Sequence, residues 1–334
     1  MEEYKDYFVE KYGDTVAAGV TYKNNLYGVK ITLPTSVWIQ YDPVWFAENG
    51  IKSPGEYYLE GTWNYENYFK VVREVTQDTD GDGKNDVVAA GNDPAMFAYP
   101  LLVIDPDSTI IEHTLNKDAT MEFLQSMYEA WNIDGSIIPG YYAAPGVNAD
   151  GVYVAMPFVH TQAYDLWAIN NLALVPIPYY ETEEDAFLTD TGYIAIVPRG
   201  VQNKEASVSL VDHIKECTSD LMEIDSVFPE DNWADPWYSD LGKQFVADWT
   251  AQAEEFYAKK PEIIAQTPIL EKLWEKNSQY VRNVKTITFL GKVGSASGYF
   301  TNYLDQPAAT ALAEMIPVFD SQVNGWNATY ARVK

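Results

Sequence analysis

The chain has 334 residues, 47% apolar and 21% charged, a composition typical of a globular protein with about two domains. Its net charge of −27 excludes nucleic acid as a partner, because binding to phosphates needs a stripe of Lys and Arg. No run of about 18 apolar residues occurs, so no segment is expected to span a membrane. The first residues do not form a signal peptide either.

Strand and helix patterns alternate along the chain. Short β-rich runs bounded by Gly, Pro or Asn predict strands at 28–33, 152–159, 172–178 and 192–198. Helical periodicity predicts helices over 241–259, 269–281 and 308–319, the last interrupted by Pro317. This alternation predicts an α/β fold with mostly parallel sheets.

Three helices also show which face is buried. Asn64 is a plausible N-cap for a helix with an inward face made of Tyr65, Tyr68, Phe69 and Val72. A helix that starts near Asp118 is expected to bury Met121, Leu124, Met127, Tyr128 and Trp131. The only cysteine, Cys217, excludes a disulfide framework, and its spacing predicts a core face shared with Ala206, Leu210, Val211 and Ile214.

Between the first two of these helices, four carboxylates alternate with other residues around two glycines, over residues 78–86. Calcium prefers six to eight oxygen ligands, and Asp at loop positions 1, 3 and 5 with a carbonyl at 7 supplies most of them. The predicted ligands are Asp78, Asp80, Asp82, the Lys84 carbonyl and Asp86. Ala89 stands where an EF-hand has its bidentate Glu, so Asp86 or a distant acid must complete the shell. We expect one structural Ca²⁺; the alternative is a solvated acidic turn.

Several short passages follow one another in a recognisable order: Asn25 to Val29, Ile39 to Asp42, Phe46 to Ile51, Gly61 to Tyr65, Ala149 to Met156, Leu174 to Pro178 and Thr191 to Ile196. Together with the acidic loop, they resemble the family 1 extracellular solute-binding proteins, the sugar-capturing components of ABC importers. Several sugar-binding members of that family hold calcium at the corresponding loop. Two passages depart from the family pattern: Tyr41-Asp42-Pro43 replaces the usual Tyr-Asn-Lys, and Met156 to His160 replaces the segment that places an aromatic in the cleft. These departures leave the ligand open.

The resemblance implies a two-lobed, periplasmic-binding-protein-like α/β fold of type II, with a multi-strand hinge. Residues 1–39 and 190–262 would form the first lobe, and residues 40–189 and 263–334 the second lobe with the calcium loop. Family members have several strand–helix units before the passage at Asn25, whereas only 24 residues precede it in this sequence. We therefore expect the first lobe to be N-terminally incomplete, with uncovered strand edges that favour association.

The resemblance also implies a ligand site, since aromatic rings stack on sugar faces while polar side chains bind hydroxyls. The candidate ligand-binding residues are Trp38, Gln40, Tyr41, Asp42, Phe158, His160, Gln162, Trp167 and Tyr193. For each of them, a place in the core or at the rim of the site is an equal alternative. The implied function is capture of a sugar or oligosaccharide by hinge closure and delivery to permease subunits, without catalysis. The implied location is extracellular, on a cell-surface lipoprotein or in the periplasm, with membrane contact only through a lipid anchor absent from this chain.

Two rival functions remain. A glycoside hydrolase would share aromatic sugar subsites and needs only two suitably spaced carboxylates, which chance can supply among 49 acids. A calcium-stabilised adhesion or carbohydrate-binding module would need no transporter. The sequence contains no G-x-S-x-G elbow, H-E-x-x-H motif or glycine-rich phosphate loop.

Overall fold

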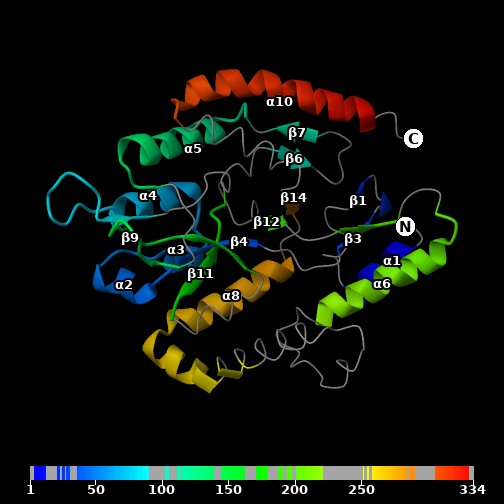
Figure 1. Ribbon diagram of the computed structural model, residues 1–334, viewed down its shortest axis with the longest axis horizontal. Coiled ribbons are helices and arrows are strands. Elements are labelled where there is room, and N and C mark those ends of the chain that lie inside the picture. Colours follow the sequence, from blue (N-terminus) through cyan, green and yellow to red (C-terminus); the bar gives the residue numbers. More distant parts are fainter. Residues whose placement is uncertain are drawn as a thin grey trace.

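The structure of the chain is a computed structural model. It describes residues 4–12, 21–22, 25–26, 28–30, 36–89, 102–104, 111–113, 115–138, 144–161, 171–179, 187–190, 194–197, 201–220, 251, 254–255, 258–283, 286–289 and 305–330. Figure 1 shows these parts as helices around short strands, with α5 and α10 on one side of the strands and α8 on the other. None of the described helices is both long and apolar enough to cross a membrane.

A three-stranded sheet lies at the centre of the described part. β4 (Ser36–Tyr41) pairs antiparallel with β10 (Phe158–Thr161) on one side and with β11 (Ala173–Pro176) on the other. The register sets Ile39 opposite both Phe158 and Val175. β4 is therefore paired with two strands that follow it by more than a hundred residues in the sequence.

The remaining strands form small sheets. The antiparallel pairs are β1 (Thr21–Tyr22) with β2 (Asn25–Leu26), β3 (Gly28–Lys30) with β13 (Ile194–Ile196), β6 (Leu102–Ile104) with β7 (Ile111–His113), and β8 (Gly146–Val147) with β9 (Tyr153–Val154). The parallel pairs are β5 (Val87–Val88) with β9, and β12 (Phe187–Asp190) with β14 (Thr286–Phe289). The prediction of mostly parallel sheets is therefore wrong for the described strands. Three of the six antiparallel pairs, those of β1 with β2, β6 with β7 and β8 with β9, are joined by connections too short for the crossover that a parallel pair needs. The fold brings the other three pairs side by side in opposite directions.

Three of the described helices, α2, α3 and α4, begin at side-chain caps. The described helices are α1 (Lys5–Tyr12), α2 (Pro43–Glu48), α3 (Pro54–Leu59), α4 (Tyr65–Val75), α5 (Asp118–Tyr128), the π-helix η5 (Glu129–Ile133), α6 (Lys204–Asp220), α8 (Ile269–Asn283) and α10 (Ala308–Tyr330). The predicted N-cap of α4 is confirmed, because the Asn64 side chain accepts a hydrogen bond from the Asn67 N–H at 3.0 Å. At α3, the N-cap Ser53 and Glu56 form a reciprocal capping box, and Pro54 occupies the first helical position between them.

A large, aromatic-rich cluster of buried side chains, the larger core, runs from Ile39 to Val323. Trp63 is fully buried within it and donates from Nε1 to the Pro176 carbonyl at 2.8 Å. The inward face predicted for α4 is confirmed. α3 lies so close to β4 that a Cβ on Gly55 would come within 2.1 Å of the Tyr41 hydroxyl oxygen, so only glycine fits there.

A second cluster, the smaller core, contains Phe8 of α1, Val29 of β3, and Val208 and Val211 of α6. Figure 1 shows α1 and α6 side by side, away from α10 and α5. The two cores fall on opposite sides of the predicted lobe division, apart from Ile39 at its edge. The lobe boundaries themselves stay a prediction.

Two predicted helix faces need correction. On α6, Val211 is buried as predicted, but Ala206 is exposed, Leu210 is 59% exposed and Ile214 36%, because the helix buries Val208 and Lys215 beside Val211. The side chain of Cys217 lies outside the described residues. On α5, Met121 is 37% exposed while Phe123, Leu124 and Met127 are buried. Leu124 and Met127 are therefore buried as predicted, and Tyr128 and Trp131 are partly buried. Met121 lies in the first turn, where Phe123 instead packs against Tyr65 and Phe69 of α4.

Candidate functional site

The predicted ligand residues at the hinge crossing lie on β4, with side chains that alternate between two faces of the sheet. Ile39 and Tyr41 belong to the larger core, whereas Trp38 and Gln40 do not. Successive side chains of a strand point to opposite faces, so Trp38 and Gln40 point away from that core. On β11, Trp38 pairs with Pro176 and Gln40 pairs with Leu174. β12 also contacts β4.

Tyr41 and Phe158 serve as core residues in this structure. Both are fully buried within the larger core, and Phe158 is packed against Tyr68. Burial raises the pKa of the Tyr41 hydroxyl far above its ordinary value. Neither ring presents a face to a ligand in this conformation, so their predicted stacking role would require the covering segments to move.

Asp42 has a structural role at the start of α2. Its Oδ1 accepts hydrogen bonds from the backbone N–H groups of Val44 at 2.9 Å and Trp45 at 3.3 Å. Burial, together with the charge of Asp42, raises the pKa of Tyr153 to about 12. Tyr153 in turn stacks on Trp45, with ring centroids 5.2 Å apart. The N-cap occupies one oxygen of Asp42 and leaves the other for different contacts.

Gln40 is the predicted residue with the most unusual surroundings. Its side chain is fully buried, and neither its amide nitrogen nor its amide oxygen has a hydrogen-bond partner among the described residues. An unpaired buried amide is costly, so such a group usually indicates a partner supplied from elsewhere. Trp38 lies on the same face of β4 and is 1% exposed.

The other predicted ligand residues are less fully described. His160 lies on β10 opposite Val37, and its side chain lies outside the described residues, as do Gln162, Trp167 and Tyr193. The structure therefore brings Trp38, Gln40, Tyr41, Asp42, Phe158 and the backbone of His160 onto one sheet and its flank. Whether they contact a ligand stays a prediction.

Sequence reasoning missed two hollows on the surface of the larger core. A groove of about 1020 Å³ lies between α2, α3 and the start of α8, with Glu48, Glu56 and Ile269 among its walls. A smaller one of about 400 Å³ lies between α4 and α5. Of the predicted ligand residues with described side chains, none lines either hollow.

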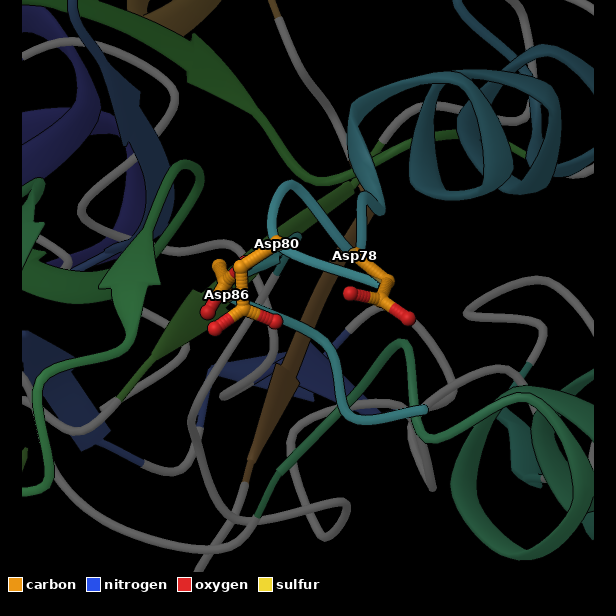
Figure 2. Close-up of side chains that lie close together, drawn as sticks. All are labelled: Asp78, Asp80 and Asp86. Atoms are coloured by element: carbon orange, nitrogen blue, oxygen red, sulfur yellow. The ribbon is translucent and has the colours of Figure 1, made fainter. Parts of the chain in front are cut away.

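The acidic loop brings carboxylates together as its spacing predicts. One oxygen each from Asp78, Asp80 and Asp86 lie within 4.8 Å of one another. Figure 2 shows these three carboxylates gathered at the loop that leaves α4. Gly81 and Gly83 have φ angles of +79° and +87°, which side chains rarely adopt, so the glycines permit the turn.

Asp82 was also predicted to be a ligand, but it lies outside this group. Its Oδ1 accepts from the Lys84 N–H at 2.8 Å, and its Oδ2 lies 3.9 Å from the Lys84 ammonium. This local turn directs the carboxylate toward Lys84 rather than toward the other three acids. The part predicted for Asp82 and the Lys84 carbonyl in metal binding is untested.

Two residues that the sequence pattern did not single out hold the loop in place. The Thr79 hydroxyl and N–H donate to Asp86 Oδ2, the latter at 2.7 Å, and they hold the pKa of Asp86 below its usual value. Asn85 reaches out of the loop to the end of η5. Backbone hydrogen bonds between Gln77 and Val87 close the base of the loop. In the sequence, the only indication of these roles is that Thr79 and Asn85 are polar residues between the expected ligands.

The loop fits a hard divalent cation. All three gathered groups are carboxylates, which are the oxygen donors that calcium prefers, and no described basic side chain pairs with Asp78, Asp80 or Asp86. Backbone N–H groups of Gly81 and Gly83 donate to Asp78 at 2.7 and 2.9 Å, which fixes that carboxylate within the loop. Three negative charges at this spacing repel one another unless a cation or solvent screens them.

No protein-family model and no curated protein sequence matches the chain. Solved structures do match. The maltose/maltodextrin-binding domain MalE from Bdellovibrio bacteriovorus, bound to maltotriose, is 17% identical with a TM-score of 0.51 over 96% of this chain and 78% of its own. An ABC substrate-binding protein from Listeria monocytogenes in complex with cycloalternan is 13% identical with a TM-score of 0.52, over 96% and 79%.

UgpB from Mycobacterium tuberculosis, in complex with glycerophosphocholine, is 12% identical with a TM-score of 0.51 over 98% of this chain and 78% of its own. At these identities the similarity concerns the fold alone. It agrees with the resemblance found in the sequence and extends over nearly the whole chain. The chain therefore has the two-lobed, type II fold of the solute-binding proteins of ABC importers.

Proposed function

We propose that the protein is the extracellular substrate-binding component of an ABC importer, which captures a sugar or oligosaccharide and delivers it to a membrane permease. The similar folds described with bound maltotriose and cycloalternan support this proposal. The two cores would be the centres of two lobes that close on the ligand. Binding needs no covalent chemistry, so we do not propose an enzyme.

The unpaired amide of Gln40 is the observation that carries the proposal. A sugar hydroxyl can both accept from an amide nitrogen and donate to an amide oxygen, so one hydroxyl pair would satisfy both atoms. Trp38, on the same face of β4, would supply an aromatic ring for stacking on a sugar. Both side chains are almost completely covered here, so the lobes must open before a ligand can reach them.

Hinge closure would convert these contacts into selectivity. A ligand that bonds to both lobes stabilises the closed state by the free energy of the contacts made only there. The permease would then bind the closed shape. The ligand class remains open to test, since the similar UgpB structure contains glycerophosphocholine.

The experiment is a thermal-shift screen against oligosaccharides, with glycerophosphocholine included. A ligand at 100 times its Kd should stabilise the protein by about 2.7 kcal/mol. Gln40→Met should abolish that shift while leaving the ligand-free protein as stable as before, or about 1 kcal/mol more stable, because an unpaired buried amide is removed. Gln266→Met, at an exposed position, is the matched control. A panel without any hit would contradict sugar capture, and full binding by Gln40→Met would remove Gln40 from the site.

The two rival functions predict different measurements. A glycoside hydrolase would release shorter products from the oligosaccharide that stabilises it, so chromatography of the incubated ligand separates catalysis from binding. An adhesion module would bind without closing. A decrease in the radius of gyration on ligand addition, measured by small-angle scattering, would favour hinge closure over that alternative.

We further propose that the acidic loop binds one structural Ca²⁺ through Asp78, Asp80 and Asp86, with Asp82 and the Lys84 carbonyl as the remaining predicted ligands. The cation would neutralise the repulsion between the carboxylates and fix the connection from α4 to β5. Calcium should raise the melting temperature, and chelation should lower it. Asp80→Ala should remove this calcium dependence, whereas Asp150→Ala, another exposed acid, should keep it. Identical melting of all variants with calcium and with chelator would leave the loop a solvated turn.

A further inference from the structure

Asn85 connects the acidic loop to a segment 49 residues further along the chain. Its Nδ2 donates to the Asp134 carbonyl at 2.8 Å and also lies 3.1 Å from the Gly135 carbonyl. The side chain therefore leaves the loop that contains the gathered carboxylates and binds the backbone at the end of η5.

The receiving carbonyls lie at the end of η5, where Asp134 is the C-cap residue. The last carbonyls of a helix have no partner within the helix, and Asn85 supplies one from outside. Gly135 has φ of +60°, and a Cβ there would lie 3.3 Å from Asn85 Nδ2. The glycine thus allows both the left-handed turn after η5 and the close approach of the amide.

The segment capped by Asn85 is linked to the base of the loop by a second route. The N–H groups of Ser136 and Ile137 donate to the Ala130 carbonyl at 2.8 and 3.2 Å, which closes the turn after η5. The Ser136 carbonyl accepts from the Ala89 N–H at 3.0 Å, three residues after Asp86. Loop and π-turn are therefore joined by one contact just before Asp86, at Asn85, and by another just after it, at Ala89.

We propose that Asn85 is a positioning residue that couples cation occupancy of the acidic loop to the order of residues 129–137. The proposal rests on the calcium site proposed above. Without a cation, repulsion among Asp78, Asp80 and Asp86 favours opening of the loop, and an opened loop carries Asn85 away from the π-turn. With a cation, the loop is fixed in the shape that presents Asn85. Because linkage is reciprocal, the two hydrogen bonds of Asn85 must also strengthen cation binding.

The test measures calcium affinity by calorimetry and backbone hydrogen exchange of the full chain with CaCl₂ or with EDTA. In the wild-type protein, calcium should slow exchange of the Asp134, Ser136 and Ile137 amides. In Asn85→Ala, calcium affinity should fall about tenfold, as expected for one or two lost hydrogen bonds, and exchange over 129–137 should no longer respond to calcium. If Asn85 had only a structural role, Asn85→Ala would raise the exchange of residues 129–137 by the same amount with and without calcium.

Asn132→Ala is the matched control. Asn132 also donates from Nδ2 to a backbone carbonyl of this helix, that of Tyr128 at 3.2 Å, but it belongs to η5 rather than to the loop. It should keep the wild-type calcium affinity and response. Should Asn85→Ala fail to fold, Gly135→Ala supplies the second variant, since its methyl group displaces the Asn85 amide from the opposite side. A calcium response of Asn85→Ala equal to that of the wild type would overturn the coupling alone. A wild-type protein that binds no calcium would overturn the calcium site and the coupling together.

Discussion

The two cores of the molecule are held together in different ways. The larger core packs tryptophan, tyrosine and phenylalanine rings, many of them from β4, α3, α4 and α10, together with aliphatic side chains. The smaller core has four buried apolar side chains and, beside them, a carboxylate with three donors. The first depends on burial of apolar area, whereas the second adds an electrostatic element that responds to pH.

That carboxylate is Asp212 of α6, and all its side-chain donors come from α1. It accepts from the Tyr7 and Tyr12 hydroxyls at 2.7 Å each and from the Lys11 ammonium at 3.0 Å. Burial alone would raise the pKa of Asp212, but these hydrogen bonds and the Lys11 charge outweigh burial and hold the pKa below its usual value. The smaller core thus has few apolar contacts, and charge-assisted hydrogen bonds add to them.

The largest effect is expected from Trp63→Ala in the larger core. The change removes a fully buried ring and the hydrogen bond to Pro176, so the free energy of unfolding should fall by about 3–5 kcal/mol. Urea denaturation followed by circular dichroism measures the loss. A loss below about 1 kcal/mol would mean that the larger core tolerates a cavity of this size, contrary to its dense aromatic packing.

Phe8→Ala tests whether the smaller core is an independent unit. Phe8 is fully buried, but its cluster is small and can collapse around the gap, so we expect a loss of about 3 kcal/mol, near the lower end for such changes. Hydrogen exchange should rise in α1 and α6 while α4 and α8 keep their protection. Equal deprotection of all four helices would show that the two cores unfold as one.

Asp212→Asn tests the electrostatic part of the smaller core. Because the folded pKa of Asp212 is depressed, its contribution to stability is present above the pKa of an unfolded Asp and is lost as the pH falls through the lower folded value. The variant should lose about 1–2 kcal/mol at neutral pH. Wild type and variant should converge in stability at acidic pH, where both side chains are neutral. A difference that persists at acidic pH would contradict the electrostatic explanation.

The smallest effect is expected at the surface of the larger core. Lys52 pairs with Glu60, but the two side chains are 36% and 56% exposed. Solvent screens such pairs, so Glu60→Gln should change the free energy of unfolding by no more than about 0.5 kcal/mol. A salt titration serves as the check, since any effect should vanish at high ionic strength.

The parts of the fold that depend on local patterns could be predicted from the sequence. Asn64 caps α4 as expected, because an N-cap and a 3.6-residue period are properties of adjacent residues. The face of α5 could not be predicted as well, since Phe123 is buried by its contacts with Tyr65 and Phe69 of α4, which are distant in the sequence. On α6, Leu210 and Val211 are equally apolar, and only the position of α1 decides which of them is buried.

The candidate sites follow the same division. The spacing of Asp78, Asp80 and Asp86 was enough to predict that their carboxylates gather, because a short loop brings them together by itself. The spacing could not indicate that Asp82 turns toward Lys84, or that Asn85 reaches η5. For β4, the resemblance pointed to Trp38, Gln40 and Tyr41, but the burial of Tyr41 depends on α3 and on the close approach of Gly55.

The span of the larger core has a consequence for biosynthesis. Its first member is Ile39 and its last are Phe319 and Val323 of α10, so the ribosome must release almost the whole chain before this core can close. Contacts of such sequence separation form late and slowly. The nascent chain therefore exposes aromatic surface throughout translation, and a holding chaperone that binds such surface would act before α10 emerges.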